Sequence, residues 1–204
     1  MHFIREYFIK DPSICDIVYD ATKKLKEKGY GQPGSAYTPN APKDFDISEV
    51  KSSWDIIPPD FAEMYPEGPS CLGLDKLANE LNDEIFPRYY QDIDLQFRGQ
   101  LFCLKPPQFQ LYEPGDGYKI WHSDATGKHI HRMFVYILYL NDVPDGGTEF
   151  KHQNYTCKAE KGKVLMFPAN FCYIHRSQVS YTSKKAIMTG WIDTDLIEML
   201  RDEL

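Results

Sequence analysis

HRMFVYILYLND, residues 131–142, decides the fold class, because it is a run of aromatic and β-branched residues closed by a turn-forming Asn-Asp pair. Turn clusters such as PGDG and PDGGT separate it from seven further β-rich runs. These are LQFRGQLFCLK (95–105), FQLYE (109–113), GYKIWHSD (117–124), TEF (148–150), KGKVLMFP (161–168), FCYIH (171–175) and AIMTGWID (186–193). So many short strands with turns between them predict an all-β sandwich or barrel over residues 95–193.

The first 94 residues instead show two helical patterns. Asp11-Pro12, an apolar stripe and then Gly29 predict a helix with an N-cap, a proline in its first turn and a C-terminal glycine. A second apolar face predicts a helix between Ser70 and Phe86, which we expect Pro87 to end. The two apolar faces consist of Ile14, Ile17, Val18, Ala21 and Leu25, and of Leu72, Leu77, Leu81 and Ile85. Both helices are expected to cover one face of the sheet.

Between the helices, residues 30–69 are rich in Gly, Pro and Asp, which predicts an extended loop without long regular elements. Its aromatic residues include Tyr30, Tyr37, Phe45, Trp54 and Phe61. The loop either closes over a peptide as a lid or packs permanently against the helices. No repeat or linker marks a boundary, so we expect a single domain over 1–204, with 1–94 as helical support and lid loop and 95–193 as the β core.

Composition excludes several classes of protein. The chain of 204 residues has a formal net charge of −7, which argues against binding to a nucleic-acid backbone. Its five cysteines are odd in number and never form Cys-x-x-Cys, so neither a disulfide framework nor a zinc ribbon is expected. This cysteine usage favours a reducing compartment.

Location is predicted from the apolar runs and from the two ends of the sequence. No apolar run is long enough for a membrane span, and the opening MHFIREYFIKD carries charges where a secretory signal has its apolar core. We therefore expect a cytoplasmic protein that is neither exported nor held in a membrane. The final RDEL (201–204) is a variant of an ER-retention signal, which acts only on a chain that first enters the ER.

A candidate metal site begins with His122-Ser-Asp124. On a strand, residues two apart project from the same face, so an imidazole and a carboxylate would point the same way. His175, at the end of the strand-like run FCYIH, is the candidate third ligand. Two histidines and one carboxylate form a facial triad, which leaves positions on a ferrous ion for an organic co-substrate and O₂. Because His-x-Asp also occurs by chance, the pair alone does not establish a metal site.

A second group of candidates lies near the end of the β region. By alternation Lys185, Ile187, Thr189 and Trp191 share one face of a strand, whereas Lys184 faces solvent; a register shift of one residue would exchange the two lysines. A lysine that points into an aromatic-rich barrel requires an anion, and a dicarboxylate co-substrate offers one. The phenol of Tyr112 could donate a hydrogen bond to the same carboxylate.

Taken together these residues resemble the Fe(II)- and 2-oxoglutarate-dependent dioxygenases, specifically the prolyl 4-hydroxylase-like branch. The resemblance covers roughly residues 95–193 and consists of Tyr112 with Pro114-Gly115, Tyr118, His122-x-Asp124, YLND (139–142) leading to Gly146-Gly147-Thr148, KGKVLMFP, His175, Lys185 and Trp191, in family order. It implies an α+β, mainly β protein with a double-stranded β-helix (jelly-roll, cupin-like) core buttressed by N-terminal helices.

The resemblance also implies roles for single residues. His122, Asp124 and His175 would hold Fe(II) as catalytic ligands, Lys185 would pair with the distal carboxylate of 2-oxoglutarate, and Tyr112 and Thr189 would assist it. O₂ would be the second co-substrate, and ascorbate is a further candidate cofactor. Since the imidazoles must be neutral, metal binding is expected to weaken below about pH 6.

Two features bear on the branch and on the substrate. Lysine at position 185 favours the collagen-type and algal-type prolyl hydroxylases over the oxygen-sensing type. Some oxygen-sensing relatives have a further tyrosine where this chain has Leu138. One contact with the co-substrate could therefore be absent here or be supplied by Tyr136. Tyr118, His131 and Trp191 are candidates for the mouth of the pocket, with core or surface roles as the alternative.

The resulting hypothesis is hydroxylation of a prolyl residue in a peptide or protein, for which the acidic surface suits a basic or proline-rich chain. The alternatives are the same chemistry on a free amino acid or other small molecule, and a catalytically silent binding module with the same fold. The sequence carries no signal for a particular oligomeric state.

Overall fold

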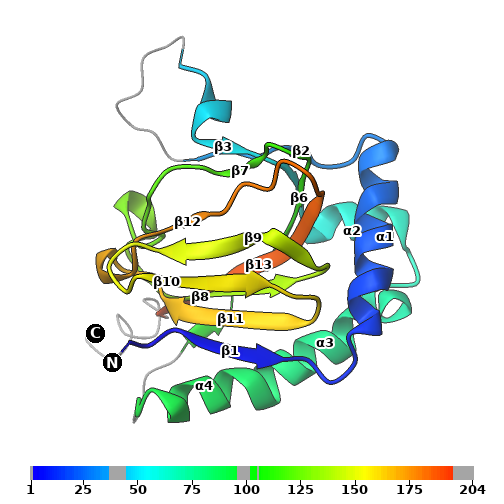
Figure 1. The fold of residues 1–204 in the computed structure, drawn as a ribbon. Coiled ribbons are helices and arrows are strands. Elements are labelled where there is room, and N and C mark those ends of the chain that lie inside the picture. Colours follow the sequence, from blue (N-terminus) through cyan, green and yellow to red (C-terminus); the bar gives the residue numbers. More distant parts are fainter. Residues whose placement is uncertain (1, 37–44, 96–101, 105, 195–204) are drawn as a thin grey trace, which may run out of the picture.

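The computed structural model describes residues 2–36, 45–95, 102–104 and 106–194, in which strands occupy the centre and helices pack outside them (Figure 1). A large antiparallel sheet has the order β1 (Arg5–Phe8), β11 (Lys163–Pro168), β8 (Arg132–Tyr139), β13 (Lys185–Thr194), β6 (Gln108–Tyr112), β4 (Trp54–Ile56) and β2 (Gln32–Pro33), and β5 (Phe102–Leu104) also pairs with β13. The smaller sheets are β10 (Tyr155–Ala159), β9 (Val143–Phe150) and β12 (His175–Ser177), and the pair β3 (Lys51–Ser52) and β7 (Gly117–Tyr118). The predicted jelly-roll core with helices at its side is confirmed.

Alternation along the strands divides the interior into two cores. On β8 the side chains of Phe134, Tyr136 and Leu138 pack toward the helices, whereas those of Val135, Ile137 and Tyr139 belong to the core on the opposite face of the large sheet. Residues of the smaller sheet, including Val143 and Phe150 of β9, complete this second core. A one-residue slip of β8 would exchange the two faces, so the register is strongly specified.

The first predicted helix is present as α1 (Ser13–Glu27). The Asp11 carboxylate accepts a hydrogen bond from the Ser13 N–H at 3.1 Å, and Gly29 follows the helix with φ of 86°, a conformation that glycine adopts at little cost. Val18 and Leu25 are fully buried, whereas Ile17 of the predicted stripe is exposed.

The second helix does not end at Pro87 as predicted. It runs through α3 (Leu74–Glu80), a π-helical turn (Leu81–Ile85) and α4 (Phe86–Asp92), and in the π turn the Phe86 N–H bonds to the Leu81 carbonyl. This wider turn lets Pro87 lie in the first turn of the next α-helical segment, where its missing N–H is tolerated. The predicted apolar face is buried as expected.

The segment 30–69 contains only short regular elements, as predicted, but some of them are strands that the sequence did not indicate. β4 pairs with β6, and β3 pairs with β7, so the described part of the segment is bonded to the β core rather than lying free above it. α2 (Pro58–Met64) and the 3₁₀ turns at Ile47–Glu49 and Pro69–Leu72 complete it. Tyr37 lies outside the described residues.

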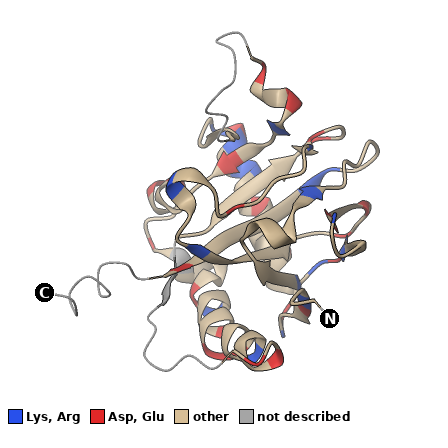
Figure 2. Cartoon of the chain, turned by 90° about the vertical axis from the view of Figure 1, so that its left-hand side faces the viewer, with Lys and Arg blue, Asp and Glu red and all other residues tan. Residues whose placement is uncertain are grey.

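Figure 2 shows Lys and Arg positions interspersed with Asp and Glu positions in that view. Within the described ranges no helix combines the length and apolar character needed to cross a bilayer.

Candidate active site

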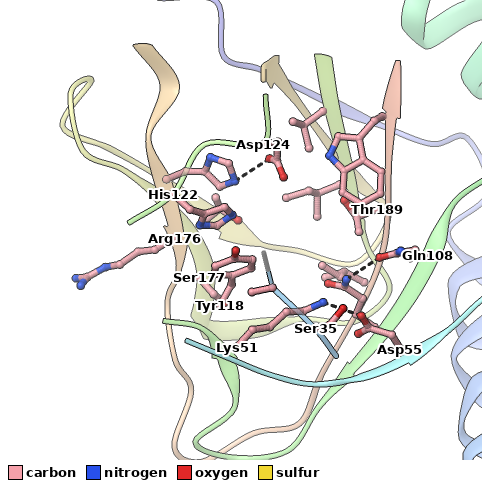
Figure 3. Close-up of a pocket in the computed structure, with 18 of the residues that line it drawn as sticks. Ser35, Lys51, Asp55, Gln108, Tyr118, His122, Asp124, Arg176, Ser177 and Thr189 are labelled. Atoms are coloured by element: carbon pink, nitrogen blue, oxygen red, sulfur yellow. Dashed lines mark hydrogen bonds and ion pairs between the residues drawn. The ribbon is translucent and has the colours of Figure 1, made fainter. Parts of the chain in front are cut away.

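The side chains of His122, Asp124 and His175 converge, with one ligand atom from each lying within 4.8 Å of the others. His122 and His175 exchange two backbone hydrogen bonds of 3.0 Å in an isolated β-bridge. The Ala125 N–H, next to Asp124, bonds to the Ala169 carbonyl at 2.9 Å. Figure 3 shows the side chains of His122 and Asp124 directed into one cavity.

Two local predictions about this group are wrong, although the grouping itself is as expected. His122 and Asp124 do not share a regular strand, because only His122 is in the bridge and Asp124 lies in the bend after it. FCYIH is not a strand either: Phe171–Tyr173 is a 3₁₀ turn, and His175 begins β12. The convergence therefore depends on pairing between two chain segments and not on spacing within one strand.

Backbone carbonyls orient both imidazoles. The Nδ1 atom of His122 lies 3.1 Å from the Ile120 carbonyl oxygen, and that of His175 lies 3.0 Å from the Tyr173 carbonyl oxygen. A carbonyl only accepts, so each Nδ1 carries the hydrogen and each Nε2 is left with a lone pair. The His175 Nε2 is 3.3 Å from Asp124 Oδ2, on the side where a metal ion would lie.

Electrostatics favour the protonation states that a metal needs. Burial, with a further contribution from His175, lowers the pKa of His122 to about 3. His122 therefore stays neutral at pH 6, and its protonation would not weaken metal binding at that pH as the sequence suggested. Burial alone would raise the pKa of Asp124, but its hydrogen bond with His175 and the nearby positive charge of Arg132 outweigh burial and lower it. Tyr118 stacks on the His122 ring at 3.5 Å between centroids.

Lys185 points into the same cavity, as predicted, and its side chain is buried. Its Nζ donates to the carbonyls of Gly146 at 3.0 Å and Gln178 at 3.3 Å and to the Ser177 hydroxyl, and it lies 4.8 Å from the centroid of the Tyr112 ring. Among the described residues no carboxylate lies within ion-pairing distance of it, and burial lowers the pKa of Lys185 to about 7.

Lys184 is exposed and pairs with Glu113 at 2.9 Å, so the register is the expected one and the two lysines are not exchanged. The predicted helper residues line the cavity but use their hydroxyl hydrogens within the protein. Tyr112 donates to Gln110 at 2.6 Å, and Thr189 donates to the Tyr136 carbonyl at 3.0 Å.

The cavity has a volume of about 420 Å³, and two of the three predicted mouth residues line it, Tyr118 and Trp191. The Arg132 guanidinium lies over the Trp191 ring, 3.7 Å from its centroid. His131 is not among the lining residues: its Nε2 lies 3.1 Å from Asp193 Oδ2 at the end of β13. Arg132, which begins β8, and His129, which ends the preceding 3₁₀ turn, line the cavity in its place.

The sequence analysis missed several lining residues. Tyr139 is fully buried, and its hydroxyl shares a 2.7 Å hydrogen bond with that of Thr148. Tyr136 instead packs on the helix side against Phe86, so it does not supply the contact considered for it. Alternation could have shown this, because Tyr139 has the parity of Ile137 and Tyr136 has the opposite one.

A buried ion pair was missed as well. Lys51 Nζ and Asp55 Oδ2 are 2.6 Å apart on the wall formed by β3 and β4 (Figure 3). The Ser53 hydroxyl donates to the other oxygen of Asp55 at 2.7 Å. Nothing in the loop-like composition of residues 30–69 indicated that these charges would be buried.

Comparison with known proteins agrees with this geometry. Residues 107–193 match the family model for the 2OG-Fe(II) oxygenase superfamily. This segment of the chain is therefore similar to that superfamily. The matched segment contains the three converging ligands, Lys185 and Trp191, so the recognised resemblance is confirmed.

Solved structures similar to this chain include three prolyl hydroxylases. One from Trichoplax adhaerens, in complex with a hypoxia inducible factor oxygen degradation domain peptide fragment, has a TM-score of 0.73 and 14% identity over 98% of this chain and 87% of its own. One from Pseudomonas putida has a TM-score of 0.63 and 17% identity over 95% and 93%. The viral collagen prolyl hydroxylase of Paramecium Bursaria Chlorella virus-1, as its 2OG complex, has a TM-score of 0.54 and 15% identity over 93% and 95%. At these identities the likeness concerns the fold, and no curated protein matches the sequence.

The residues that line the cavity fit Fe(II) and 2-oxoglutarate. Two imidazoles that present unprotonated Nε2 atoms and one ionised carboxylate form the nitrogen and oxygen donor set that suits a ferrous ion, and the cavity opens on one side of it. Lys185, which lines the same cavity, is buried and has no carboxylate partner among the described residues, which fits the far carboxylate of a keto diacid.

Proposed function

We propose that this chain is an Fe(II)- and 2-oxoglutarate-dependent dioxygenase that hydroxylates prolyl residues in a peptide or protein and converts 2-oxoglutarate to succinate. The observation that carries the proposal is that His122, Asp124 and His175 line the same 420 Å³ cavity as the buried Lys185. Three ligands for a ferrous ion and one cation for a dicarboxylate are the minimum that this chemistry requires.

When bound, Fe(II) and 2-oxoglutarate supply the oxidation: 2-oxoglutarate and O₂ give succinate and CO₂, and the second oxygen atom enters the substrate C–H bond. The protein residues orient and shield this chemistry. The Ile120 and Tyr173 carbonyls hold the imidazoles in the metal-binding tautomer. Lys185 fixes the co-substrate at its far end, and the Tyr118 ring on His122 keeps bulk water from that ligand.

A peptide substrate is supported by the shape of the mouth and by one relative. The cavity is open to the surface, where Tyr118, Arg132 and Trp191 offer aromatic faces and a cation to an extended chain. The prolyl hydroxylase from Trichoplax adhaerens was solved with a peptide fragment. Although the protein as a whole is acidic, Lys128, Arg132 and Arg176 line the cavity. These positive charges would repel a basic side chain, so we do not expect a positively charged residue directly beside the target proline of the substrate.

The test measures succinate release from 2-oxoglutarate in the presence of Fe(II), with proline-rich peptides, the same peptides with alanine for proline, and free amino acids. We expect release that depends on the proline-containing peptides and is lost in His175→Ala, and mass spectrometry should place one added oxygen on a prolyl residue. Repetition without ascorbate tests its role as a cofactor. Imaging of the tagged protein tests the proposed cytoplasmic location.

Other outcomes identify the alternatives. Stimulation by a free amino acid and not by peptides would establish a small-molecule oxygenase with the same centre. No succinate release with any substrate, together with no effect of His122→Ala on a cellular phenotype, would establish a binding module. Crystals grown without O₂ in Mn(II) and 2-oxoglutarate test the ligands and Lys185 together, and metal held by His129 and His131 instead would overturn the assignment.

A further inference from the structure

Gln110 lines the cavity, but the proposed chemistry gives this residue no role. On β6, Gln108, Gln110 and Tyr112 all line the cavity, and they stand opposite Thr189, Ile187 and Lys185 of β13. The Tyr112 hydroxyl donates to Gln110 Oε1 at 2.6 Å, and Gln110 Nε2 donates to Gln108 Oε1 at 3.3 Å. Gln110 and Tyr112 are both buried, so the hydrogen bond between them is shielded from water.

The row leaves Tyr112 with a conflict between two acceptors. A phenol has a single O–H hydrogen, and here Gln110 accepts it. The expected second acceptor is the far carboxylate of 2-oxoglutarate, because Lys185 Nζ lies 4.8 Å from the centroid of the Tyr112 ring. While the Tyr112 hydroxyl donates its hydrogen to Gln110, an incoming carboxylate meets the lone pairs of the phenol oxygen, which repel it.

We propose that Gln110 is a positioning residue that competes with 2-oxoglutarate for the hydroxyl hydrogen of Tyr112 and thereby weakens co-substrate binding. The inference rests on the proposed use of 2-oxoglutarate. Burial keeps the pKa of Tyr112 well above its ordinary value, so the phenol stays protonated and the competition persists across the working pH range. Gln110 is not a metal ligand, so its effect belongs to binding and not to the oxidation step.

The experiment measures the Kd of 2-oxoglutarate by calorimetry with the Mn(II)-loaded protein, which binds without turnover. Gln110→Met, of similar length and volume but without an acceptor oxygen, is expected to tighten binding about 3- to 10-fold, the factor that one neutral hydrogen bond contributes. Gln110→Asn, one methylene shorter, should shift the Kd in the same direction. Gln108→Met is the matched control, because Gln108 lines the same wall without touching Tyr112, and it should change the Kd less than 2-fold.

A double-mutant cycle separates competition from a general effect on the cavity. In the Tyr112→Phe background, Gln110→Met should leave the Kd unchanged, since no hydroxyl hydrogen remains to compete for. With the Fe(II) enzyme, the KM for 2-oxoglutarate should fall in Gln110→Met while kcat stays constant. Circular dichroism of each variant verifies that it is folded.

Several results would overturn the inference. Weaker or unchanged binding in Gln110→Met and Gln110→Asn would show that Gln110 supports Tyr112 or is irrelevant to it. An equal effect in the Tyr112→Phe background would show that the change does not act through the phenol. If the unaltered protein bound Mn(II) but no 2-oxoglutarate, the proposed function itself would fail, whereas normal binding with an insensitive Gln110 would overturn only this inference.

Discussion

Lys185 illustrates how a single residue couples burial to co-substrate binding. In place of water, the buried ammonium donates hydrogen bonds to two backbone carbonyls and a hydroxyl, none of which carries a full negative charge. Burial therefore favours the neutral amine and lowers the pKa of Lys185 from the ordinary 10.5 to about 7. A bound dicarboxylate would favour the ammonium again, so binding of 2-oxoglutarate should be linked to uptake of a proton above pH 7.

This linkage predicts the pH dependence of 2-oxoglutarate binding. Because only the ammonium form pairs with the carboxylate, affinity should be nearly constant below pH 7 and fall toward tenfold per pH unit above it. Calorimetry from pH 6 to 9 with the Mn(II)-loaded protein measures it. Lys185→Arg is the matched control, since arginine stays charged throughout and should abolish this part of the dependence. An equally steep decline in Lys185→Arg would assign the titration to another group.

Strands β9 and β10 show how closely the elements around the site are packed. A Cβ added to Gly147 would lie 2.0 Å from the Cys157 carbonyl oxygen of β10, and this atom belongs to the backbone and cannot turn aside. The neighbouring Gly146 provides the carbonyl that accepts from Lys185. Gly147 therefore allows the two strands to approach closely, and the adjacent Gly146 of β9 contacts the buried lysine through its carbonyl.

We predict that Gly147→Ala lowers the free energy of unfolding by about 2–4 kcal/mol, because β9 and β10 must separate to admit the methyl group. Gly68→Ala is the control for backbone strain without a clash: its φ is 91°, and an added Cβ meets nothing within 4 Å. It should cost only about 1 kcal/mol, from backbone strain. Urea unfolding of both variants measures the difference, and equal losses would show that the contact with Cys157 is unimportant.

The ion pair between Lys51 and Asp55 joins strand β3 to strand β4. Both side chains are less than a tenth exposed. Removal of one partner leaves the other charge buried, so Asp55→Ala should lower the free energy of unfolding by about 3–5 kcal/mol. Replacement of both by apolar residues, Lys51→Met with Asp55→Leu, should cost much less in the same denaturation experiment. A double variant as unstable as Asp55→Ala would contradict this account.

At the scale of the whole molecule, one sheet serves both cores. β8 and β13 contribute residues to the core under the helices and to the core that surrounds the cavity. Loss of either core would expose the other face of the same strands, so we expect a single cooperative unfolding transition. Ligands that bind in the cavity should then stabilise the entire described fold and not the local loops alone.

Ligand binding should accordingly shift the global transition. Mn(II) with 2-oxoglutarate at 100 times its Kd should raise the free energy of unfolding by about 2.7 kcal/mol, and fluorescence and circular dichroism should report the same increase in Tm. His175→Ala, which lacks one metal ligand, should show no such increase. A ligand-dependent shift by only one of the two probes would indicate that the cores unfold separately.

The sequence by itself determined which residues were candidates for the proposed chemistry and on which face of β13 they lie. Alternation placed Lys185 inward and Lys184 outward, because a strand has a strict period of two. The apolar spacing likewise gave the buried face of α1 and of the second helix, although a π turn carried that helix past Pro87.

Only the tertiary structure decided how the site is assembled. His122 faces His175 through a bridge between distant segments, and Gln110 meets Tyr112, Lys51 meets Asp55 and His131 turns toward Asp193. Local spacing cannot specify such contacts, because they depend on which strands pair and how bends direct side chains after a strand ends. Alternation indicates which side of a strand a residue occupies, whereas packing between segments selects the group that it meets there.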